Sequence, residues 1–181
     1  TPTMYFAVLQ EKADAGIQLT ASHNPSHYNG IKIVMRDDKK IIKIGSDTGM
    51  QDIKKSVLEN ITEKNIGGSY VKRSGIVEEE IKNAFKIISS DGIKPLTVVV
   101  DAGNAMAALY IEPLFKKLPC KLIKMNFKLD GTFPSHQPDP LIFDNFKDLY
   151  KRVVSEKADL GIAPDGDGDR IFFVDEKGKM I

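Results

Sequence analysis

A short acidic run near the end of the chain carries the strongest chemical signal in the sequence. Asp165, Asp167 and Asp169 occupy alternate positions with a glycine between each pair, and Arg170 follows directly. Three carboxylates this close repel one another unless a cation or a set of hydrogen-bond donors lies among them. The glycines let the backbone turn tightly enough for the carboxylates to converge. The run therefore predicts a cation-binding loop.

The ligand types narrow the choice of cation. Carboxylate oxygens suit Mg²⁺ or Ca²⁺, whereas zinc prefers His and Cys, which the run lacks. An EF-hand calcium loop places acidic residues at its first, third and fifth positions, glycine at its sixth and glutamate at its twelfth. Counting from Asp165, Glu176 meets the last requirement, but Arg170 replaces the glycine and strand-like segments flank the run. The EF-hand is disfavoured, and a non-catalytic Ca²⁺-binding module is the alternative from another functional class.

A second polar stretch, Thr20-Ala-Ser-His-Asn-Pro25, also follows a strand-like segment. Ser22 and His23 could form a nucleophile with its base. However, neighbouring side chains on an extended segment point to opposite sides, and the G-x-S-x-G elbow of many hydrolases is absent. A hydrolase is therefore disfavoured, and a structural turn with capping hydroxyls is the alternative. Lys32, taken alone, is typical of a solvated surface lysine.

The first part of the chain predicts the elements that position this polar stretch. Apolar and polar residues alternate in two short segments, which indicates strands. Asn29-Gly30 lies just before the second segment and predicts a tight connection between the two strands. The expected elements are a helix over 2–13, strands over 17–20 and 31–34, and a helix over 47–59.

The second part of the chain predicts a doubly wound sheet, because strands and helices alternate along it. Its first strand is a nearly continuous apolar run, as expected of a parallel strand covered on both faces. The expected strands cover 96–100, 121–125, 159–163 and 171–174, and the expected helices cover 77–88 and 106–117. A third helix is expected to be capped by Asp144 and to bury Phe146, Leu149, Tyr150, Val153 and Val154.

The fold class expected from these patterns is α/β, with two three-layer α/β domains whose sheets are mixed or parallel. The break at Gly67-Gly68-Ser69 places the boundary between a first domain at 1–73 and a second at 74–181. Ligands of such sheets bind beyond the carboxyl ends of the strands. Both polar loops follow strands directly, so both are expected where chemistry tends to occur.

Composition restricts the partners. The chain has 181 residues with 26 basic against 25 acidic side chains, a net charge of +1, which argues against nucleic acid as a partner. Cys120 is the one cysteine, so an internal disulfide and a multi-cysteine zinc site are excluded. No apolar run is long enough to span a bilayer, so no membrane is expected and a cytoplasmic location is the default.

Several motifs together resemble those of a known family, the alpha-D-phosphohexomutases. Thr20-Ala-Ser-His-Asn-Pro25 with Tyr28-Asn-Gly-Ile-Lys32 resembles the family's phosphoserine loop, and the run from Asp165 to Arg170 resembles its metal loop. Val100-Asp-Ala-Gly-Asn104 and the stretch from Asp130 to Pro140 resemble the second domain of the bacterial phosphomannomutase/phosphoglucomutase branch. Thr20 and the stretch from Phe133 to Pro140 look less like the phosphoglucosamine mutase branch, which is the nearer alternative.

The resemblance implies a role for each polar residue. Ser22 would be the phosphorylated serine, and Asp165, Asp167 and Asp169 would hold Mg²⁺ together with a phosphate oxygen on that serine. Such a metal neutralises the charge of a transferring phosphoryl group.

Three further side chains receive roles from the resemblance. Lys32, with its pKa lowered by its surroundings, would be the general acid/base. Arg170 would offer a donor fork to phosphate oxygens. His23 would orient the loop.

The implied reaction is the exchange of a phosphoryl group between Ser22 and a phosphosugar. A hexose phosphate of mannose or glucose would become a hexose 1,6-bisphosphate, turn over in the site and return its other phosphate to the serine. The family uses four domains, of which this chain would hold the incomplete first and the second, without domains 3 and 4. Arg73-Ser-Gly75 resembles the phosphate loop of the fourth domain only by coincidence. The isolated chain is expected to be inactive.

Overall fold

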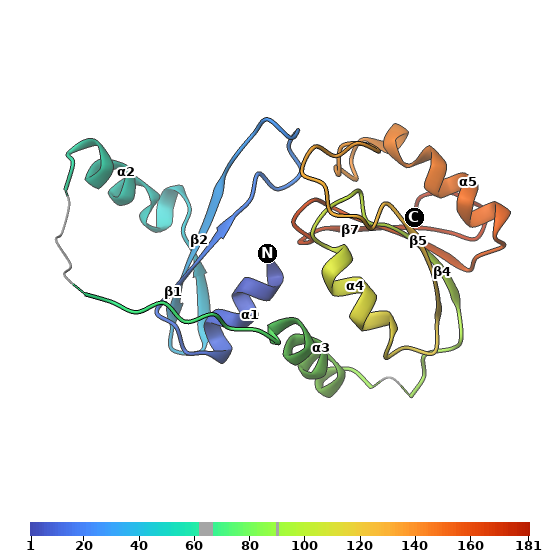
Figure 1. Cartoon of the computed structure of the whole chain (residues 1–181), viewed down its shortest axis with the longest axis horizontal. Helices are drawn as coiled ribbons and strands as arrows, with labels where there is room; N and C mark the ends of the chain where they lie inside the picture. Colours follow the sequence, from blue (N-terminus) through green and yellow to red (C-terminus); the bar gives the residue numbers. More distant parts are fainter. Residues whose placement is uncertain (62–66, 90) are drawn as a thin grey trace.

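The fold consists of two sheets that lie side by side along the length of the molecule (Figure 1). The structure, a computed structural model, describes residues 1–61, 67–89 and 91–181. One sheet has three strands in the order β1-β2-β3, and the other has four in the order β5-β4-β6-β7. The predicted α/β class is confirmed.

The first part of the chain contains α1 (Pro2–Gln10), β1 (Ala15–Leu19), β2 (Ile31–Asp37), β3 (Lys40–Lys43), a π-helical turn η1 (Ser46–Met50) and α2 (Gln51–Leu58). The second part contains α3 (Ile76–Ile87), β4 (Thr97–Asp101), α4 (Ala108–Phe115), β5 (Lys121–Met125), a 3₁₀ turn η2 (Phe143–Phe146), α5 (Lys147–Ser155), β6 (Leu160–Pro164) and β7 (Ile171–Val174). None of the helices in these described stretches is long and apolar enough to cross a membrane.

The four-stranded sheet is covered on both faces. Its central strand β4 pairs in parallel with β5 and β6, and β7 is antiparallel to β6. Because successive side chains of a strand point to opposite faces, Val98 and Val100 pack with α4 while Val99 packs with α5. This arrangement confirms the parallel strand predicted from the apolar run and places the core on each side of β4.

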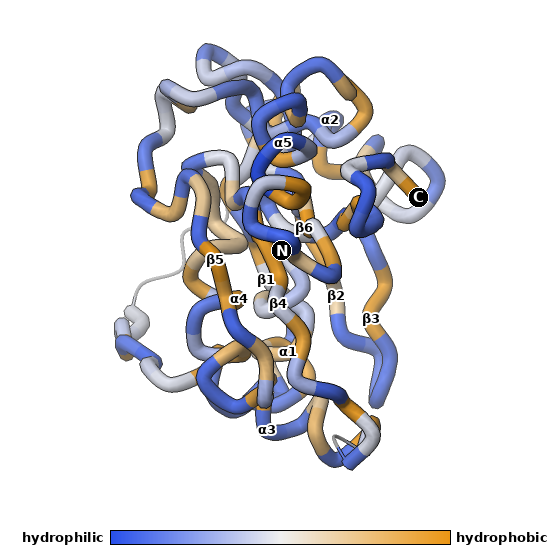
Figure 2. The backbone as a smooth tube through the Cα atoms, turned by 90° about the vertical axis from the view of Figure 1, so that its right-hand side faces the viewer, coloured by the Kyte–Doolittle hydropathy of each residue, from blue (hydrophilic) through white to orange (hydrophobic). Residues whose placement is uncertain are grey.

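The three-stranded sheet is antiparallel throughout and differs in its covering. Helix α1 packs on the face that carries Gly16 and Val34, where a Cβ on Gly16 would come within 2.4 Å of Val8. The opposite face carries apolar side chains that remain open to solvent, including Ile17, Leu19 and further residues of β2 and β3. Figure 2 shows how apolar residues follow the strands while most connecting loops are hydrophilic.

The predicted tight connection at Asn29-Gly30 is wrong. Strands β1 and β2 do pair, but the whole segment 20–30 connects them, and it closes through a hydrogen bond from Thr20 N to the Gly30 carbonyl at 2.9 Å. Gly30 is required for another reason, since a Cβ there would lie 2.5 Å from the Thr20 carbonyl oxygen. The strand β3, which the sequence did not predict, follows a sharp turn at Asp38, where φ is 52°.

The expected cap at Asp144 is also wrong. The 3₁₀ turn η2 precedes α5, the helix has no side-chain cap, and Asp144 instead forms an ion pair with Lys147 at 3.0 Å. The buried face of this segment contains Phe146, Leu149 and Val153, as predicted. Val154 is exposed and Tyr150 is only partly buried, so the apolar stripe is narrower than the spacing suggested.

Candidate functional site

The acidic run forms a tight loop between β6 and β7, and we name residues 165–170 the acidic loop. It is closed by a hydrogen bond from Asp165 N to the Arg170 carbonyl at 3.1 Å. Gly168 turns the backbone with φ of 73°, a conformation that residues with a side chain rarely adopt. The strands on either side, which the sequence predicted, leave no room for an EF-hand arrangement of helices.

The three aspartates of this loop converge. Their carboxylate oxygens lie within 4.8 Å of one another, and Asp165 and Asp167 are buried whereas Asp169 is exposed. Asp165 Oδ1 accepts hydrogen bonds from the backbone N–H groups of Asp169 and Arg170, and its Oδ2 accepts one from Arg170 Nε at 2.9 Å. Asp167 Oδ1 is buried and has no hydrogen-bond partner among the described residues. The loop is thus stabilised by its own contacts and retains an unused buried acceptor.

Lys32 reaches this loop from the other sheet. The pairing of β1 with β2 sets Lys32 opposite Gln18, and its Nζ donates to Asp167 Oδ2 at 2.6 Å and to Asp169 Oδ2 at 2.7 Å. Burial alone would lower the pKa of Lys32, but its hydrogen bonds with the two carboxylates outweigh burial and raise it. The expectation of a lowered pKa is therefore wrong, because the charged ammonium lies between two carboxylates.

Thr1 is a contact that the sequence reasoning missed. Its backbone nitrogen donates to the Asp167 carbonyl at 2.7 Å and its hydroxyl donates to Asp167 Oδ2. Burial tends to raise the pKa of Asp167, but the hydrogen bonds from Lys32 and Thr1 outweigh it and lower the pKa. A threonine just before the proline that starts a helix is common, so the sequence held no signal that predicts such a contact.

Residues 20–25, which we name the serine loop, form a turn at the end of β1. Ser22 has φ of 61°, and its N–H donates to Thr20 Oγ1 at 2.8 Å. His23 Nδ1 lies 3.3 Å from Ser22 Oγ. The premise that these two side chains point to opposite sides is wrong, because the backbone turns here instead of continuing extended. A positive φ at a residue other than glycine is costly and often marks a functional position.

The serine loop and the acidic loop meet although about 140 residues separate them in the sequence. Gly166 packs so closely that a Cβ there would lie 2.3 Å from the Ser22 carbonyl oxygen. Gln137, which the sequence reasoning did not single out, donates from Nε2 to the His23 carbonyl at 2.8 Å. Gly166 N donates in turn to the Pro138 carbonyl at 3.1 Å. The structure thus brings together the serine, the lysine and the acidic residues that the sequence singled out separately.

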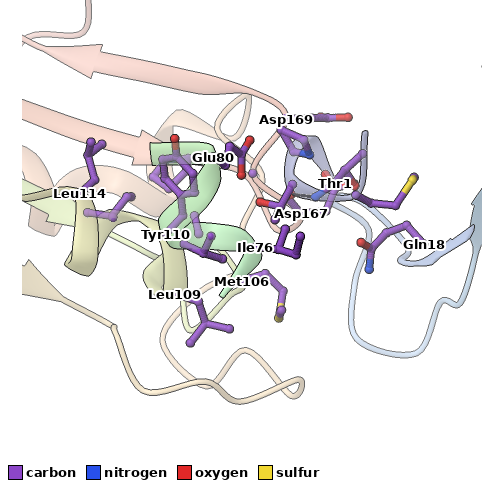
Figure 3. Close-up of a pocket in the computed structure, with 18 of the residues that line it drawn as sticks. Thr1, Gln18, Ile76, Glu80, Met106, Leu109, Tyr110, Leu114, Asp167 and Asp169 are labelled. Carbon is purple, nitrogen blue, oxygen red and sulfur yellow. Dashed lines mark hydrogen bonds between the residues drawn. The ribbon is translucent and has the colours of Figure 1, made fainter. Parts of the chain in front are cut away.

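Two cavities adjoin the loops. The larger, about 710 Å³, has mainly apolar walls from α1, α3 and α4 and ends at Asp167 and Asp169 (Figure 3). Burial and the nearby Glu80 carboxylate raise the pKa of Tyr110 in its wall. The smaller, about 280 Å³, lies beside Ser22 and is also bordered by Asn104. Both cavities are thus bordered by residues of the loops.

The acidic loop fits a hard divalent cation. Its donor set consists only of oxygens, and the unpartnered Asp167 Oδ1 is an acceptor that a cation could use. The ammonium of Lys32 lies against Asp167 and Asp169, so a metal would compete with it for these oxygens. Because the three carboxylates converge, the described residues nevertheless contain an acidic group that could hold a metal.

Comparison with protein families finds two consecutive matches. The model described as "Phosphoglucomutase/phosphomannomutase, alpha/beta/alpha domain I" matches residues 1–64. The model described as "Phosphoglucomutase/phosphomannomutase, alpha/beta/alpha domain II" matches residues 78–178. Together they cover both sheets and both loops.

Individual proteins agree with the family models. A phosphomannomutase of Vibrio cholerae is 36% identical over all of this chain, which spans 40% of that protein. A phosphomannomutase/phosphoglucomutase of Pseudomonas aeruginosa is also 36% identical over all of this chain, which spans 37% of it. A crystal structure of a phosphoglucomutase/phosphomannomutase family protein from Burkholderia thailandensis superposes with a TM-score of 0.79 and 33% identity over 93% of this chain and 35% of that one.

Proposed function

The chain belongs to the phosphoglucomutase/phosphomannomutase family, and we propose that it supplies the phosphoserine and metal-binding loops of a phosphohexomutase. The enzyme would interconvert hexose 1-phosphates and hexose 6-phosphates of mannose or glucose. One observation carries this proposal: the serine loop and Lys32, both from the first sheet, lie directly against the acidic loop of the second. A phosphoryl carrier and a cation site need such proximity to act together.

We assign the two loops to two domains, residues 1–73 and 74–181. The assignment is supported by the two separate sheets, the first of which ends with β3 and the second of which begins with β4. The site would then lie at the junction between the domains, with the serine on one side and the carboxylates on the other.

Mg²⁺ is the cation that we propose for the acidic loop, with Asp165, Asp167, Asp169 and a phosphate oxygen on Ser22 as its ligands. When bound, Mg²⁺ would neutralise charge on the transferring phosphoryl group. Asp165 has a second task, since its bonds to the loop backbone and to Arg170 hold the loop in shape. Lys32 would have to leave Asp167 and Asp169 at least in part, because the ammonium and the metal compete for the same oxygens.

Ser22 and Lys32 would carry out the transfer itself. The bond between Ser22 Oγ and phosphorus breaks while a hydroxyl oxygen of the hexose phosphate forms its own bond to that phosphorus. One proton must pass from the sugar hydroxyl to Ser22 Oγ in the same event. Lys32 can donate a proton to Ser22 Oγ as an ammonium and recover one from the sugar hydroxyl as an amine, which makes it the general acid/base.

Arg170 and His23 would position the groups that react. Arg170 Nη2 is buried and has no partner among the described residues, while its Nε is fixed on Asp165, so the guanidinium has a free donor for a phosphate oxygen. His23 Nδ1 lies 3.3 Å from Ser22 Oγ and can orient that hydroxyl when the serine is not phosphorylated.

The remaining machinery is proposed to lie outside this chain. The chain spans 37–41% of the length of curated relatives that it matches. We propose that domains 3 and 4 of the same enzyme bind the sugar and its distal phosphate while the hexose 1,6-bisphosphate turns over. Because substrate binding and reorientation depend on them, this chain alone should show no mutase turnover.

Phosphorylation of Ser22 tests the proposal. The full-length protein is incubated with glucose 1,6-bisphosphate and Mg²⁺, and intact mass with peptide mapping locates any phosphoryl group. We expect one group on Ser22, none after Ser22→Ala, and an unchanged result after Ser26→Ala in the adjoining turn. A phosphoryl group that persists in Ser22→Ala, or none in the unsubstituted protein, would contradict the proposed function.

A further inference from the structure

His136 lies at the centre of a hydrogen-bonded chain between the second sheet and the serine loop. Its ring Nε2 is 3.0 Å from Asp101 Oδ2, and its Nδ1 is 3.0 Å from the Gln137 carbonyl oxygen. Both partners are acceptors. A ring nitrogen donates to an acceptor only when it carries a proton, so the imidazolium is the form that satisfies both contacts at once.

Asp101 is the anchor of this chain. It ends β4, it is 1% exposed, and its Oδ1 accepts hydrogen bonds from Gly103 N at 3.0 Å and Asn126 Nδ2 at 2.8 Å. A carboxylate so deeply buried is costly unless an opposite charge accompanies it. His136 supplies that charge from a side chain that is itself largely buried.

Gln137 carries the chain onward to the serine loop. Its carbonyl accepts from His136 and also from Asn145 Nδ2 at 3.0 Å, which fixes the backbone at this point. Its side-chain Nε2 donates to the His23 carbonyl at 2.8 Å. The next residue, Pro138, accepts a hydrogen bond from Gly166 N of the acidic loop. Residues 136–138, which we name the bridge segment, therefore contact both loops of the site.

We infer that His136 is a positioning residue, which as an imidazolium anchored on Asp101 holds the bridge segment so that the serine loop stays against the acidic loop. The inference rests on the proposed function, since the loop that is positioned is the one that carries Ser22. His136 contacts the Gln137 backbone and Asp101, and no reacting atom is assigned to it. It therefore acts through Gln137 on the serine loop.

The geometry implies a pH dependence with a definite sign. Burial favours the neutral ring, but the hydrogen bonds to Asp101 and to the Gln137 carbonyl outweigh burial and raise the pKa of His136. The charge of Asp148 in α5 acts in the same direction, and the Phe146 ring, edge-on at 5.0 Å, carries no charge. A raised pKa means that the stabilisation is complete below the ordinary pKa of histidine and is lost as the pH rises through the folded value. The serine loop should loosen on the alkaline side.

The first experiment measures how two quantities depend on pH: the protonation of His136 and the protection of the serine loop from hydrogen exchange. NMR follows the ring signals of its three histidines, while hydrogen exchange, corrected for the intrinsic rate at each pH, gives the protection of the backbone amides of residues 22–24. We expect protection to fall at the pH where His136 loses its proton, with exposed His27 as the internal reference. Asp101→Asn should move both midpoints to lower pH together and leave His27 unchanged.

A second variant removes the last hydrogen bond of the series, the one from Gln137 to the serine loop. Gln137→Met keeps the length of the side chain and leaves the His136–Asp101 pair in place, but removes the donor to the His23 carbonyl. Protection at 22–24 should fall about fivefold, the factor that one ordinary hydrogen bond contributes. The titration of His136 should stay unchanged. This variant does not disturb buried charge, so it tests the link between the bridge segment and the serine loop even if Asp101→Asn does not fold.

A purely structural histidine–aspartate pair would give other results. If the midpoint of loop protection does not follow that of His136, or if Gln137→Met leaves protection unchanged, the inference is wrong. These readouts need no phosphosugar. A serine loop that follows His136 but whose Ser22 accepts no phosphoryl group would therefore refute the proposed function while leaving the positioning role in place.

Discussion

The two loops of the site are built in different ways. The acidic loop is closed by its own backbone, and its buried Asp165 accepts three hydrogen bonds within the loop. The serine loop has local bonds of its own but is also held from outside, by Gln137 and by contact with Gly166. Both loops have outside contacts, since Pro138, Lys32 and Thr1 also bond to the acidic loop. The difference is that the acidic loop has a buried carboxylate of its own at its centre, which the serine loop lacks.

The two sheets show the same contrast. The sheet behind the acidic loop is packed on both faces, with Val99 and Leu149 fully buried. The sheet behind the serine loop is packed by α1 on one face, while Ile17 and Leu19 on the other face are mostly exposed. A site assembled from these parts combines an acidic loop on a sheet packed on both faces with a serine loop, the proposed phosphoryl carrier, on a sheet packed on one face. If one part of the site adjusts during a reaction, we expect it to be the serine loop, because its sheet has fewer packing contacts.

Asp165→Ala tests whether the acidic loop is held by its own carboxylate. The substitution leaves two backbone N–H groups and Arg170 Nε, all partly buried, without their acceptor. We expect a loss of about 3 kcal/mol in the free energy of unfolding, measured by chemical denaturation. Asp169→Ala is the matched control, because it removes the same charge from an exposed position and should change stability little. Equal losses in the two variants would mean that the loop is not organised around Asp165.

Leucine truncation tests the contrast between the sheets. Leu149→Ala removes a fully buried side chain from the core cluster on β4 and should cost about 2–5 kcal/mol. Leu19→Ala removes the same atoms from a side chain that is 74% exposed and should stay within about 0.5 kcal/mol. Denaturation of both variants in this chain provides the measurement. A large loss in Leu19→Ala would show that the open face is already covered.

Gly166→Ala tests the contact between the loops. Because the added Cβ would lie 2.3 Å from the Ser22 carbonyl oxygen, one of the backbones must move. A displacement of this kind at a transferring group can cost about 100-fold in rate, so we expect that loss in phosphorylation of Ser22 in the full-length protein. Gly131→Ala, where nothing lies within 4 Å of the new Cβ, is the control. Unchanged phosphorylation would indicate that the two loops act independently.

Part of this arrangement could be predicted from the sequence because the signals are local. Alternating aspartates and glycines indicate a cation loop by type and spacing alone, and the apolar run of β4 indicates a buried parallel strand. Strand β3 was missed because lysines at both ends of a short segment hide its pairing with β2. The tight turn expected at Asn29-Gly30 failed because Gly30 serves a close backbone approach and not a hairpin.

The rest of the site depends on tertiary contacts that no local pattern records. Lys32 has the pattern of a surface lysine, and only the pairing of β1 with β2 and the approach of the second sheet bring it to Asp167. Gln137 and His136 lie in an irregular stretch where spacing carries no information about direction. Their roles follow from the residues at the other ends of their hydrogen bonds, Asp101 and His23.

Arg73→Ala should have the smallest effect on stability. It tests whether a surface ion pair or the contact between the loops holds the two sheets together. Arg73 donates to Glu11 at 2.8 Å and to Glu79 at 2.6 Å, so it ties the end of α1 to α3 on the surface. Exposed ion pairs of this kind contribute little and weaken with salt. We expect an unfolding midpoint no lower than that of Arg152→Ala, which removes an exposed pair within and just beyond α5. Serine-loop protection should also stay unchanged, because the bridge segment and Gly166 hold that loop. A marked loss of protection in Arg73→Ala, but not in Arg152→Ala, would show that the two sheets are held together by the surface pair and not by the contact between the loops.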